Sequence, residues 1–157
     1  DGLPGLEDFA KEVIAVGNGA VLVVGAVDEN YAMADFSNRP GPDTQFFLAA
    51  RGDSVCCQYR DGQLYVDPEG FIYLYSGTSF ATPQVSGAAA LLADAFPNLT
   101  GQQIADILLR SAFDAGAVGV DAVFGRGILD INRALQPLAQ GHRHGLGHGL
   151  AGQPGDH

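Results

Sequence analysis

The sequence predicts an α/β protein in which helices cover a mostly parallel sheet. The apolar, β-branched run Ala20–Val27 has the composition of a strand that is buried on both faces. Two helical segments follow later in the chain, one rich in small apolar residues over Pro83–Ala95 and one that begins after Thr100. Strands that alternate with helices in this way favour a layered α/β fold.

The elements of the first half follow from composition. Residues 1–10 are expected to form a loop and a short helix, and Val13–Val16 is a first, short β-branched apolar run. Ala20–Val27 is the first strand, and Asp28–Asn30 turns the chain after it. Residues 36–43 are expected to form a loop because they are rich in Pro, Gly, Asn and Asp.

A second strand and a polar excursion come next. Phe46–Ala50 is expected to form a short strand that ends at Gly52. The stretch Gln58–Gly70 is polar and rich in turn residues, which predicts a surface hairpin. An apolar run, Phe71–Tyr75, then leads into a glycine turn.

The second half is expected to be mainly helical. Pro83–Ala95 is apolar nearly all round, which predicts a helix buried on all sides. Thr100 and Gln103 have the spacing of a capping box, and Ile104, Ile107 and Leu108 mark one face of the helix that follows.

The last ordered elements are short. Gly125–Asp130 is expected to form a turn and a strand, with Asp130 capping a final helix through Leu138. Residues 140–157 are rich in Gly and His and lack apolar periodicity, so we expect a disordered tail there and a single folded domain over residues 1–139.

Composition bounds the class of protein. The 157 residues are 46% hydrophobic, enough for one domain with a core. The net charge of −10 disfavours nucleic acid and anionic membranes as partners. Because the chain begins Asp1-Gly2 and its only methionine is Met33, we expect the C-terminal piece of a longer product.

The two cysteines are adjacent, at Cys56 and Cys57. Neighbouring Cα atoms across a trans peptide lie about 3.8 Å apart, which is shorter than the usual span of a disulfide. We therefore expect two thiols, or disulfide partners outside this chain. Two adjacent cysteines without further ligands also form a poor zinc site.

The most informative run is Gly77-Thr78-Ser79-Phe80-Ala81-Thr82-Pro83, directly before the small-residue helix. A serine at a helix start faces unpaired backbone N–H groups and the positive end of the helix dipole. That environment suits an alkoxide nucleophile and the oxyanion that forms when it attacks a carbonyl. The alternative role is an ordinary Ser/Thr helix cap.

This run resembles the serine motif of the subtilisin-like serine proteases, Gly-Thr-Ser-Met/Phe-Ala-x-Pro. The resemblance implies that Ser79 is the nucleophile and that its own N–H is one oxyanion donor. It places Thr78 beside the oxyanion hole and makes Gly77 the residue that lets the backbone approach substrate. Pro83 is expected in the first turn of the helix, where a missing N–H costs least.

The resemblance extends over roughly Ala20–Leu138. Val23–Asp28 is similar to the family's strand before a Ser/Asn turn, and Leu48–Gly52 lies where the family usually has Ala-Pro-Gly, with Arg51 in place of proline. Gly125–Leu129 is similar to the closing strand, particularly that of bacterial autotransporter members. The resemblance implies a subtilisin-like three-layer arrangement, here incomplete at the N-terminus.

The groups that activate a serine are not apparent in the sequence. The family order is Asp, His, Ser, yet no Asp-Thr/Ser-Gly or His-Gly-Thr motif precedes Ser79, and Asp43-Thr44-Gln45 has the wrong third residue. Val16–Gly19 only superficially resembles the family's Ala-Gly-Asn segment, so Asn18 is better interpreted as a turn residue than as the second oxyanion donor.

The histidines all belong to the tail, at His142, His144, His148 and His157. A tail histidine could serve as base in an α/β-hydrolase order, but that fold expects Gly-x-Ser-x-Gly and Ala81 replaces its second glycine. A weak metal site is a further alternative, and a solvated linker or remnant is the favoured interpretation. No metal site is therefore predicted.

The sequence thus predicts the C-terminal portion of a subtilisin-like serine endopeptidase domain, exported by a bacterium to the cell surface or beyond. Its expected partners are protein or peptide substrates and the missing N-terminal part of the domain. We expect negligible activity from the chain alone. Calcium often supports this family, but no acidic cluster here identifies a site. The alternative function is a degenerate, non-catalytic protease-like module that acts in binding or structure.

Overall fold

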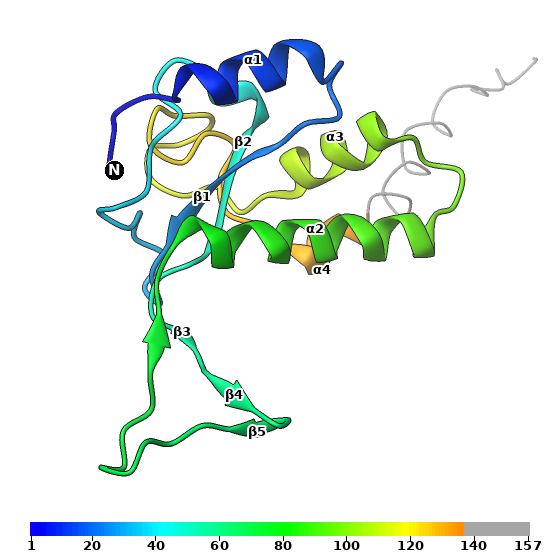
Figure 1. Ribbon diagram of the computed structural model, residues 1–157. Helices are drawn as coiled ribbons and strands as arrows, with labels where there is room; N and C mark the ends of the chain where they lie inside the picture. Colours follow the sequence, from blue (N-terminus) through cyan, green and yellow to red (C-terminus); the bar gives the residue numbers. More distant parts are fainter. Residues whose placement is uncertain (137–157) are drawn as a thin grey trace, which may run out of the picture.

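The computed structural model describes residues 1–136, which form three layers (Figure 1). A short parallel sheet is the middle layer, and helices lie on both of its faces. Strand β1 (Val23–Val27) pairs in parallel with β2 (Phe47–Arg51) through five residue pairs. On the other edge of β2, Ile128 forms a parallel bridge with Ala49. The α/β class and the two strands predicted from composition are confirmed.

One face of the sheet is covered by helices α2 (Thr78–Ala95), α3 (Gly101–Ser111) and α4 (Ile131–Ala134). Small side chains let α2 lie close to the strands, because an alanine adds only a methyl group between helix and sheet. The buried residues of this layer are Ala26, Ala34, Leu48, Ala50, Ala81, Val85, Ala88, Leu92, Leu108, Leu109 and Ala134.

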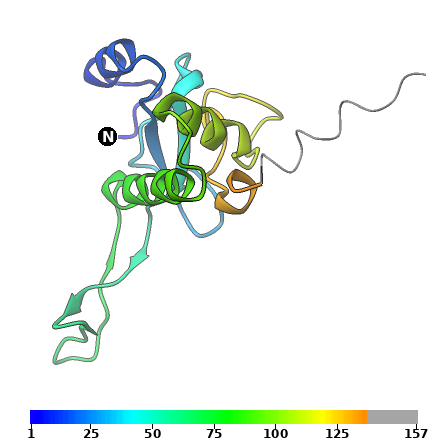
Figure 2. The same ribbon diagram turned by 90° about the vertical axis from the view of Figure 1, so that its right-hand side faces the viewer.

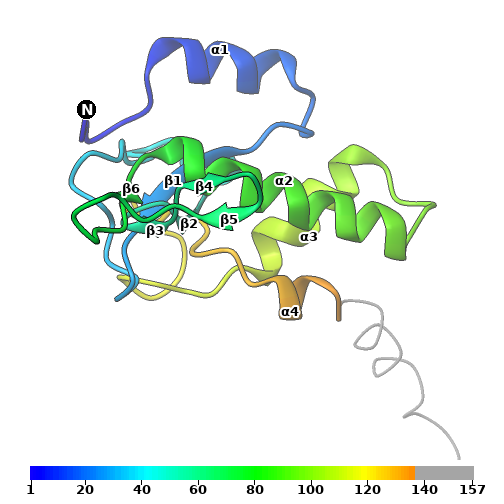
Figure 3. The ribbon, with the colours of Figure 1, turned by 60° about the horizontal axis from the view of Figure 1, so that its bottom comes forward.

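The opposite face of the sheet packs against α1 (Asp8–Val16), which lies across the strands from α2 (Figures 1 and 3). Residues that alternate with those of the first face form this second core, with Ala10 and Ile14 of α1 packed against it. Its buried members are Leu6, Val27, Met33, Phe47, Ala49 and Ile128. The expected three-layer arrangement is therefore present.

Two helix starts predicted from capping residues are confirmed. At the start of α3, the N–H of Gln103 donates to Thr100 Oγ1 at 3.2 Å, and Gln103 Oε1 accepts the N–H of Thr100 at 2.8 Å. Asp130 Oδ1 accepts the N–H of Arg133 at 2.9 Å and so caps α4. Helix α4 ends at Ala134, four residues earlier than expected.

Two helical segments differ from the expectation. Val13–Val16 forms the last part of α1, because the apolar residues from Ala10 to Ile14 contact the sheet with helical spacing. Helix α2 begins at Thr78 rather than Pro83 and buries one stripe, Ala81, Val85, Ala88 and Leu92, instead of its whole circumference. Its other side is exposed because no described element packs on it.

Residues 53–76 form an extension that we call the arm, which projects from the body (Figures 1 and 2). At its base, β3 (Val55–Cys56) pairs antiparallel with β6 (Leu74–Tyr75). Further out, β4 (Tyr59–Arg60) pairs antiparallel with β5 (Gln63–Leu64), which confirms the expected surface hairpin.

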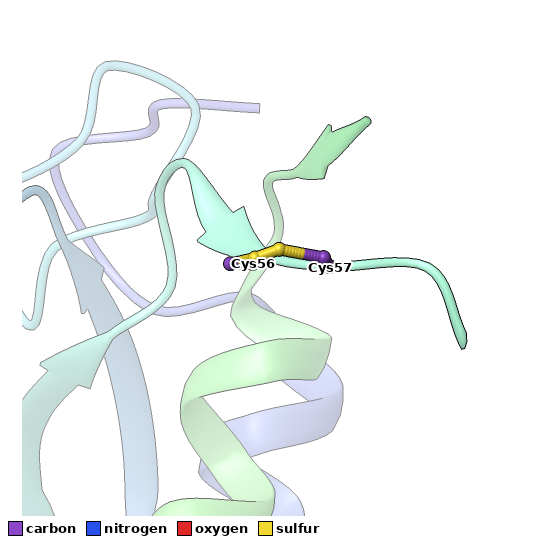
Figure 4. Close-up of a disulfide and its surroundings, with 2 residues drawn as sticks. All are labelled: Cys56 and Cys57. Carbon is purple, nitrogen blue, oxygen red and sulfur yellow. A yellow bond between two sulfur atoms is a disulfide. The ribbon is translucent and has the colours of Figure 1, made fainter. Parts of the chain in front are cut away.

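The adjacent cysteines do not fit the expectation of two free thiols. Cys56 and Cys57 form a disulfide at the base of the arm (Figure 4). The expectation rested on the short spacing of neighbouring residues, and the structure pairs the two sulfur atoms despite it.

The remaining described segments are loops and one 3-10 turn, η1 (Thr44–Phe46), which precedes β2. None of the helices within residues 1–136 has the length and apolar character needed to cross a bilayer. The predicted tail over residues 140–157 lies outside the described residues.

Candidate active site

Ser79 is the second residue of α2 and is exposed to solvent. The helix starts immediately after Gly77, its N-cap residue, and Thr78 is its first residue. The three residues singled out in the sequence therefore lie together at one helix N-terminus, because they are consecutive in the chain.

The N-terminus of α2 retains free backbone donors beside the serine. Phe80 donates its N–H to the carbonyl of Gly77 at 3.0 Å. Within residues 1–136, the N–H groups of Thr78 and Ser79 meet no acceptor. Two free donors at the positive end of a helix dipole favour negative charge next to the Ser79 hydroxyl.

Pro83 also changes the hydrogen bonding of Ser79. It is the sixth residue of α2, in the second turn rather than the expected first, because the helix begins earlier than predicted. A proline at this place has no N–H to donate to the carbonyl four residues before it, which belongs to Ser79. Thr82 Oγ1 donates to the neighbouring carbonyl of Thr78 at 2.9 Å.

The turn before Ser79 is anchored to the loop that follows β2. Gly77 donates its N–H to the carbonyl of Gly52 at 2.8 Å. Ser76 Oγ donates to Asp53 Oδ1 at 2.5 Å and accepts the N–H of Ser54 at 3.0 Å. These contacts fix the chain on the N-terminal side of the serine, a role that no local sequence signal assigned to Ser76 or Asp53.

Gly52 is required by this close approach. A Cβ at Gly52 would lie 2.7 Å from Ala26 Cβ, 2.9 Å from the carbonyl oxygen of Gly77 and 3.1 Å from Ala81 Cβ. Backbone and short methyl groups cannot move aside as a long side chain can, so any larger residue would push α2 from the sheet. The glycine noted next to Arg51 thus sets the position of the serine turn.

Gln84 ties the second turn of α2 to the end of β2. Its Nε2 donates to the carbonyl of Arg51 at 2.6 Å and to that of Phe80 at 2.9 Å. Arg51, which occupies the usual proline position, therefore still contributes a backbone acceptor to the support of the helix start.

Thr78 faces away from the Gln84 side of α2. It lines a cavity of about 300 Å³ together with residues of β1, β2 and α1. The other lining residues are Asp1, Leu6, Glu7, Ala10, Val23, Val24, Phe36, Asn38 and Phe47.

Asn18 is remote from this site. Its carbonyl accepts from Gln102 Nε2 at 2.8 Å, at the start of α3. Because α3 begins beyond the C-terminal end of the 18-residue helix α2, a helix length of about 27 Å separates this region from Ser79. Asn18 has a positive φ of 46°, as expected of a turn asparagine.

The other polar candidates do not complete the site. Asp43 precedes the 3-10 turn η1, and the four histidines lie beyond the described part of the chain. In the described part, no three His, Cys, Asp or Glu side chains gather as they would to hold a metal ion. Within residues 1–136 the structure therefore places an exposed serine hydroxyl beside free backbone N–H groups, with no histidine near it.

The chain is similar to several known proteins. A family model described as the subtilase family matches residues 10–127. The thermostable alkaline protease of Halalkalibacterium halodurans is 35% identical over 116 residues, which are 74% of this chain and 28% of that protein. The neisserial autotransporter lipoprotein NalP of Neisseria meningitidis serogroup B is 47% identical over 60 residues, 38% of this chain and 6% of that protein.

A solved structure is similar as well. The self-cleaved protease domain of PatA matches with a TM-score of 0.56 and 34% identity, over 76% of this chain and 42% of that chain. The present chain thus spans less than a third of each of the two curated relatives and less than half of this solved domain.

Proposed function

Because this chain belongs to the subtilase family, we propose that it supplies the nucleophile part of a serine endopeptidase and that Ser79 is the nucleophile. One observation carries the proposal. Ser79 is exposed at the N-terminus of α2 beside backbone N–H groups that have no other acceptor among the described residues. A capping serine would instead occupy the N-cap position, which here belongs to Gly77.

The reaction follows from this placement. Ser79 Oγ attacks the carbonyl carbon of the scissile peptide while a base removes its proton. The negative charge that develops on the carbonyl oxygen is stabilised by the N–H of Ser79. The intermediate then expels the amine, which takes up the proton, and water hydrolyses the acyl-enzyme. Gly77 leaves space for substrate, and Thr78 flanks the oxyanion.

We propose that another segment of the same peptidase domain supplies the three groups that Ser79 lacks. These are the base, the residue that orients the base and a second oxyanion donor. No histidine precedes Ser79 in this sequence. The side of α2 that carries Ser79 is open, and the chain spans 42% of the PatA protease domain. Residues 1–139 would then be the C-terminal portion of such a domain, and the missing portion its first partner.

A serine without a base is a weak nucleophile. We therefore expect the chain by itself to hydrolyse peptides negligibly. Protein or peptide substrates are the proposed partners of the completed site, and a calcium requirement would belong to that completed domain.

Covalent labelling tests the proposal. The chain alone and the product of its reading frame extended upstream of Asp1 are treated with a fluorophosphonate probe. We expect labelling of the extended product only, on the peptide that contains Ser79. The S79A variant should lose the label, whereas S86A, which removes another exposed hydroxyl of α2, should keep it.

Two results would contradict this proposal. Robust labelling of Ser79 in the chain alone would show that the site is not incomplete. Labelling of the extended product that survives S79A would show that another residue is the nucleophile.

The second candidate function is a non-catalytic, protease-like module. The observations that favour it are the absent Asp and His motifs and the replacement of the usual proline by Arg51. An extended product that lacks these motifs and that the probe leaves unlabelled would support this function instead.

Export is proposed from the relatives. NalP is described as an autotransporter lipoprotein, and the closing segment of this chain resembles autotransporter members. We infer an exported protein at or beyond the cell surface. Fractionation of the producing cells tests this, since a product found only in the cytoplasm would contradict it.

A further inference from the structure

A cavity of about 450 Å³ lies at the carboxyl ends of β1 and β2, which end at Val27 and Arg51. Gln84 borders it from α2, five residues after Ser79 and so about 140° further around the helix axis. The cavity is therefore separate from the candidate active site. Its other lining residues are Tyr31, Ala50, Phe113, Ile128, Leu129, Asp130, Ile131 and Asn132.

The floor of the cavity is apolar. Val27 is 1% exposed and Ile128 is 5% exposed, and both belong to the same core on one face of the sheet. Tyr31 and Phe113 form a tilted aromatic pair at its side, with ring centroids 6.3 Å apart. Such a surface favours an apolar or aromatic side chain of modest size.

A cationic group stands at one wall. Arg51 Nε donates to the carbonyl of Asp53 at 3.0 Å, which holds the guanidinium in place. Its Nη2 lies 3.9 Å from Glu29 Oε2, in a pair whose two side chains are both solvent-exposed and which is therefore weak. The guanidinium keeps donors for a carboxylate.

An anionic group stands at the neighbouring strand end. Ile128 forms an isolated parallel bridge with Ala49, and Arg51 and Asp130, each two residues after this bridge, both line the cavity. Asp130 Oδ1 accepts the N–H of Arg133, and its Oδ2 has no partner within residues 1–136. In that same part of the chain, Arg51 and Asp130 form no ion pair with each other.

Two amide groups add further hydrogen-bonding capacity. Gln84 uses its Nε2 for backbone carbonyls, which leaves its Oε1 without a donor among the described residues. The side chain of Asn132 is likewise unengaged in the part of the chain that the structure describes. The lining of the cavity thus combines a cationic side chain, an anionic side chain and two side-chain amides with an apolar surface.

We propose that this cavity binds a free α-amino acid with an apolar or aromatic side chain. The α-carboxylate pairs with Arg51, the α-ammonium group pairs with Asp130, and the side chain lies against Val27 and Ile128 beside the Tyr31–Phe113 pair. A zwitterion matches two opposite charges that face one cavity without neutralising each other, which neither a simple anion nor a simple cation does. This site does not depend on the function proposed for Ser79.

Isothermal titration calorimetry on the chain tests the proposal with L-phenylalanine as the probe. N-acetyl-L-phenylalanine lacks the ammonium group, L-phenylalaninamide lacks the carboxylate, and glycine lacks the side chain. We expect L-phenylalanine to bind and each of the three analogues to bind at least about tenfold more weakly. Equal binding of an analogue, or no binding of L-phenylalanine, would overturn the proposal.

Two substitutions locate the site. R51Q and D130N should each weaken L-phenylalanine binding by about tenfold, because each removes one charge-assisted hydrogen bond. Asparagine is also a good N-cap, so D130N keeps the start of α4. R110Q is the matched control, because Arg110 pairs with Asp106 on the exposed surface of α3.

The control variant should bind L-phenylalanine as the unmodified chain does. Unchanged binding by both R51Q and D130N would place the amino acid elsewhere and contradict the proposal. The analogue series requires no substitution, so it decides the question even if one variant fails to fold.

Discussion

The body and the arm use apolar residues in opposite ways. In the body, residues that are mostly small or aliphatic are buried between helices and sheet, as Ala26, Leu48 and Ala81 are, each 0% exposed. In the arm, large side chains face solvent, with Phe71 and Tyr59 both 65% exposed. The difference shows that stacking of elements in layers, rather than hydrophobicity alone, decides which residues are buried in this chain.

The arm is ordered by local contacts. Asp67 Oδ1 accepts the N–H groups of Phe71 at 2.8 Å and Glu69 at 3.0 Å, and Tyr73 Oη donates to Asp67 Oδ2 at 2.7 Å. At its base, the ring of Tyr75 stacks on that of Phe80 at 5.8 Å. Two-stranded ribbons have too little area to form a core, so polar turns and single aromatic contacts take its place.

Adjacent residues of α2 show the same contrast and give the test with the largest expected effect. Leu92 is 1% exposed within the core and Leu91 is 51% exposed. We expect L92A to lower the free energy of unfolding by about 3 kcal/mol, through lost burial and a cavity. Urea denaturation followed by circular dichroism measures it.

The matched variant L91A makes the same chemical change on the open side of α2. Its cost should be well under 1 kcal/mol, because little buried area is lost. If L91A and L92A destabilise the chain equally, the side of α2 that carries Leu91 is covered in solution and is not open.

Two glycines, one packed and one open, should respond in opposite directions when a methyl group is added. G52A should lower the free energy of unfolding by about 2 kcal/mol, because its methyl group would overlap Ala26, Ala81 and the Gly77 carbonyl. G87A should raise it by about 0.5 to 1 kcal/mol, because Gly87 is in α2 and a Cβ there would meet no atom within 4 Å. Thermal denaturation of both variants measures the difference.

The critical result is whether each substitution raises or lowers the free energy of unfolding. A stable G52A variant would mean that the loop after β2 does not limit the approach of the serine turn. A destabilised G87A variant would mean that the open side of α2 is not open.

The arm provides the smallest expected effect, which is local and depends on pH. The N–H of Phe71, followed by the hydroxyl of Tyr73, lowers the pKa of Asp67 from its usual 3.8 by favouring the ionised form. The stabilisation of this turn is therefore fully present above pH 3.8 and is lost as the pH falls through the lowered pKa.

The amide resonances of Phe71 and Glu69 should report this transition by NMR, with a midpoint below pH 3.8. The Y73F variant removes one of the hydrogen bonds that lower the pKa, so its midpoint should rise. An unchanged midpoint in Y73F would show that Tyr73 does not contribute. Stability of the body should not follow this titration, because Asp67 lies on the exposed arm.

Features encoded by neighbouring residues were predictable from the sequence. Strand β1, the capping box at Thr100 and the cap at Asp130 depend on patterns within a few residues. The candidate nucleophile was found for the same reason, since Gly77, Thr78 and Ser79 are consecutive and a helix follows them directly. Its assignment as the nucleophile remains a prediction that labelling can test.

Features that need distant segments were decided by the tertiary structure alone. The open side of α2 was not predictable because apolar composition does not say which elements pack against a helix. Gly52 and Ser76 support the serine turn across more than twenty residues of arm, and Arg51 and Asp130 line one cavity although 78 residues separate them in the chain. Short-range hydrogen bonding and periodicity specify elements, whereas steric fit between them specifies the cavity, the supports of Ser79 and the exposed surfaces.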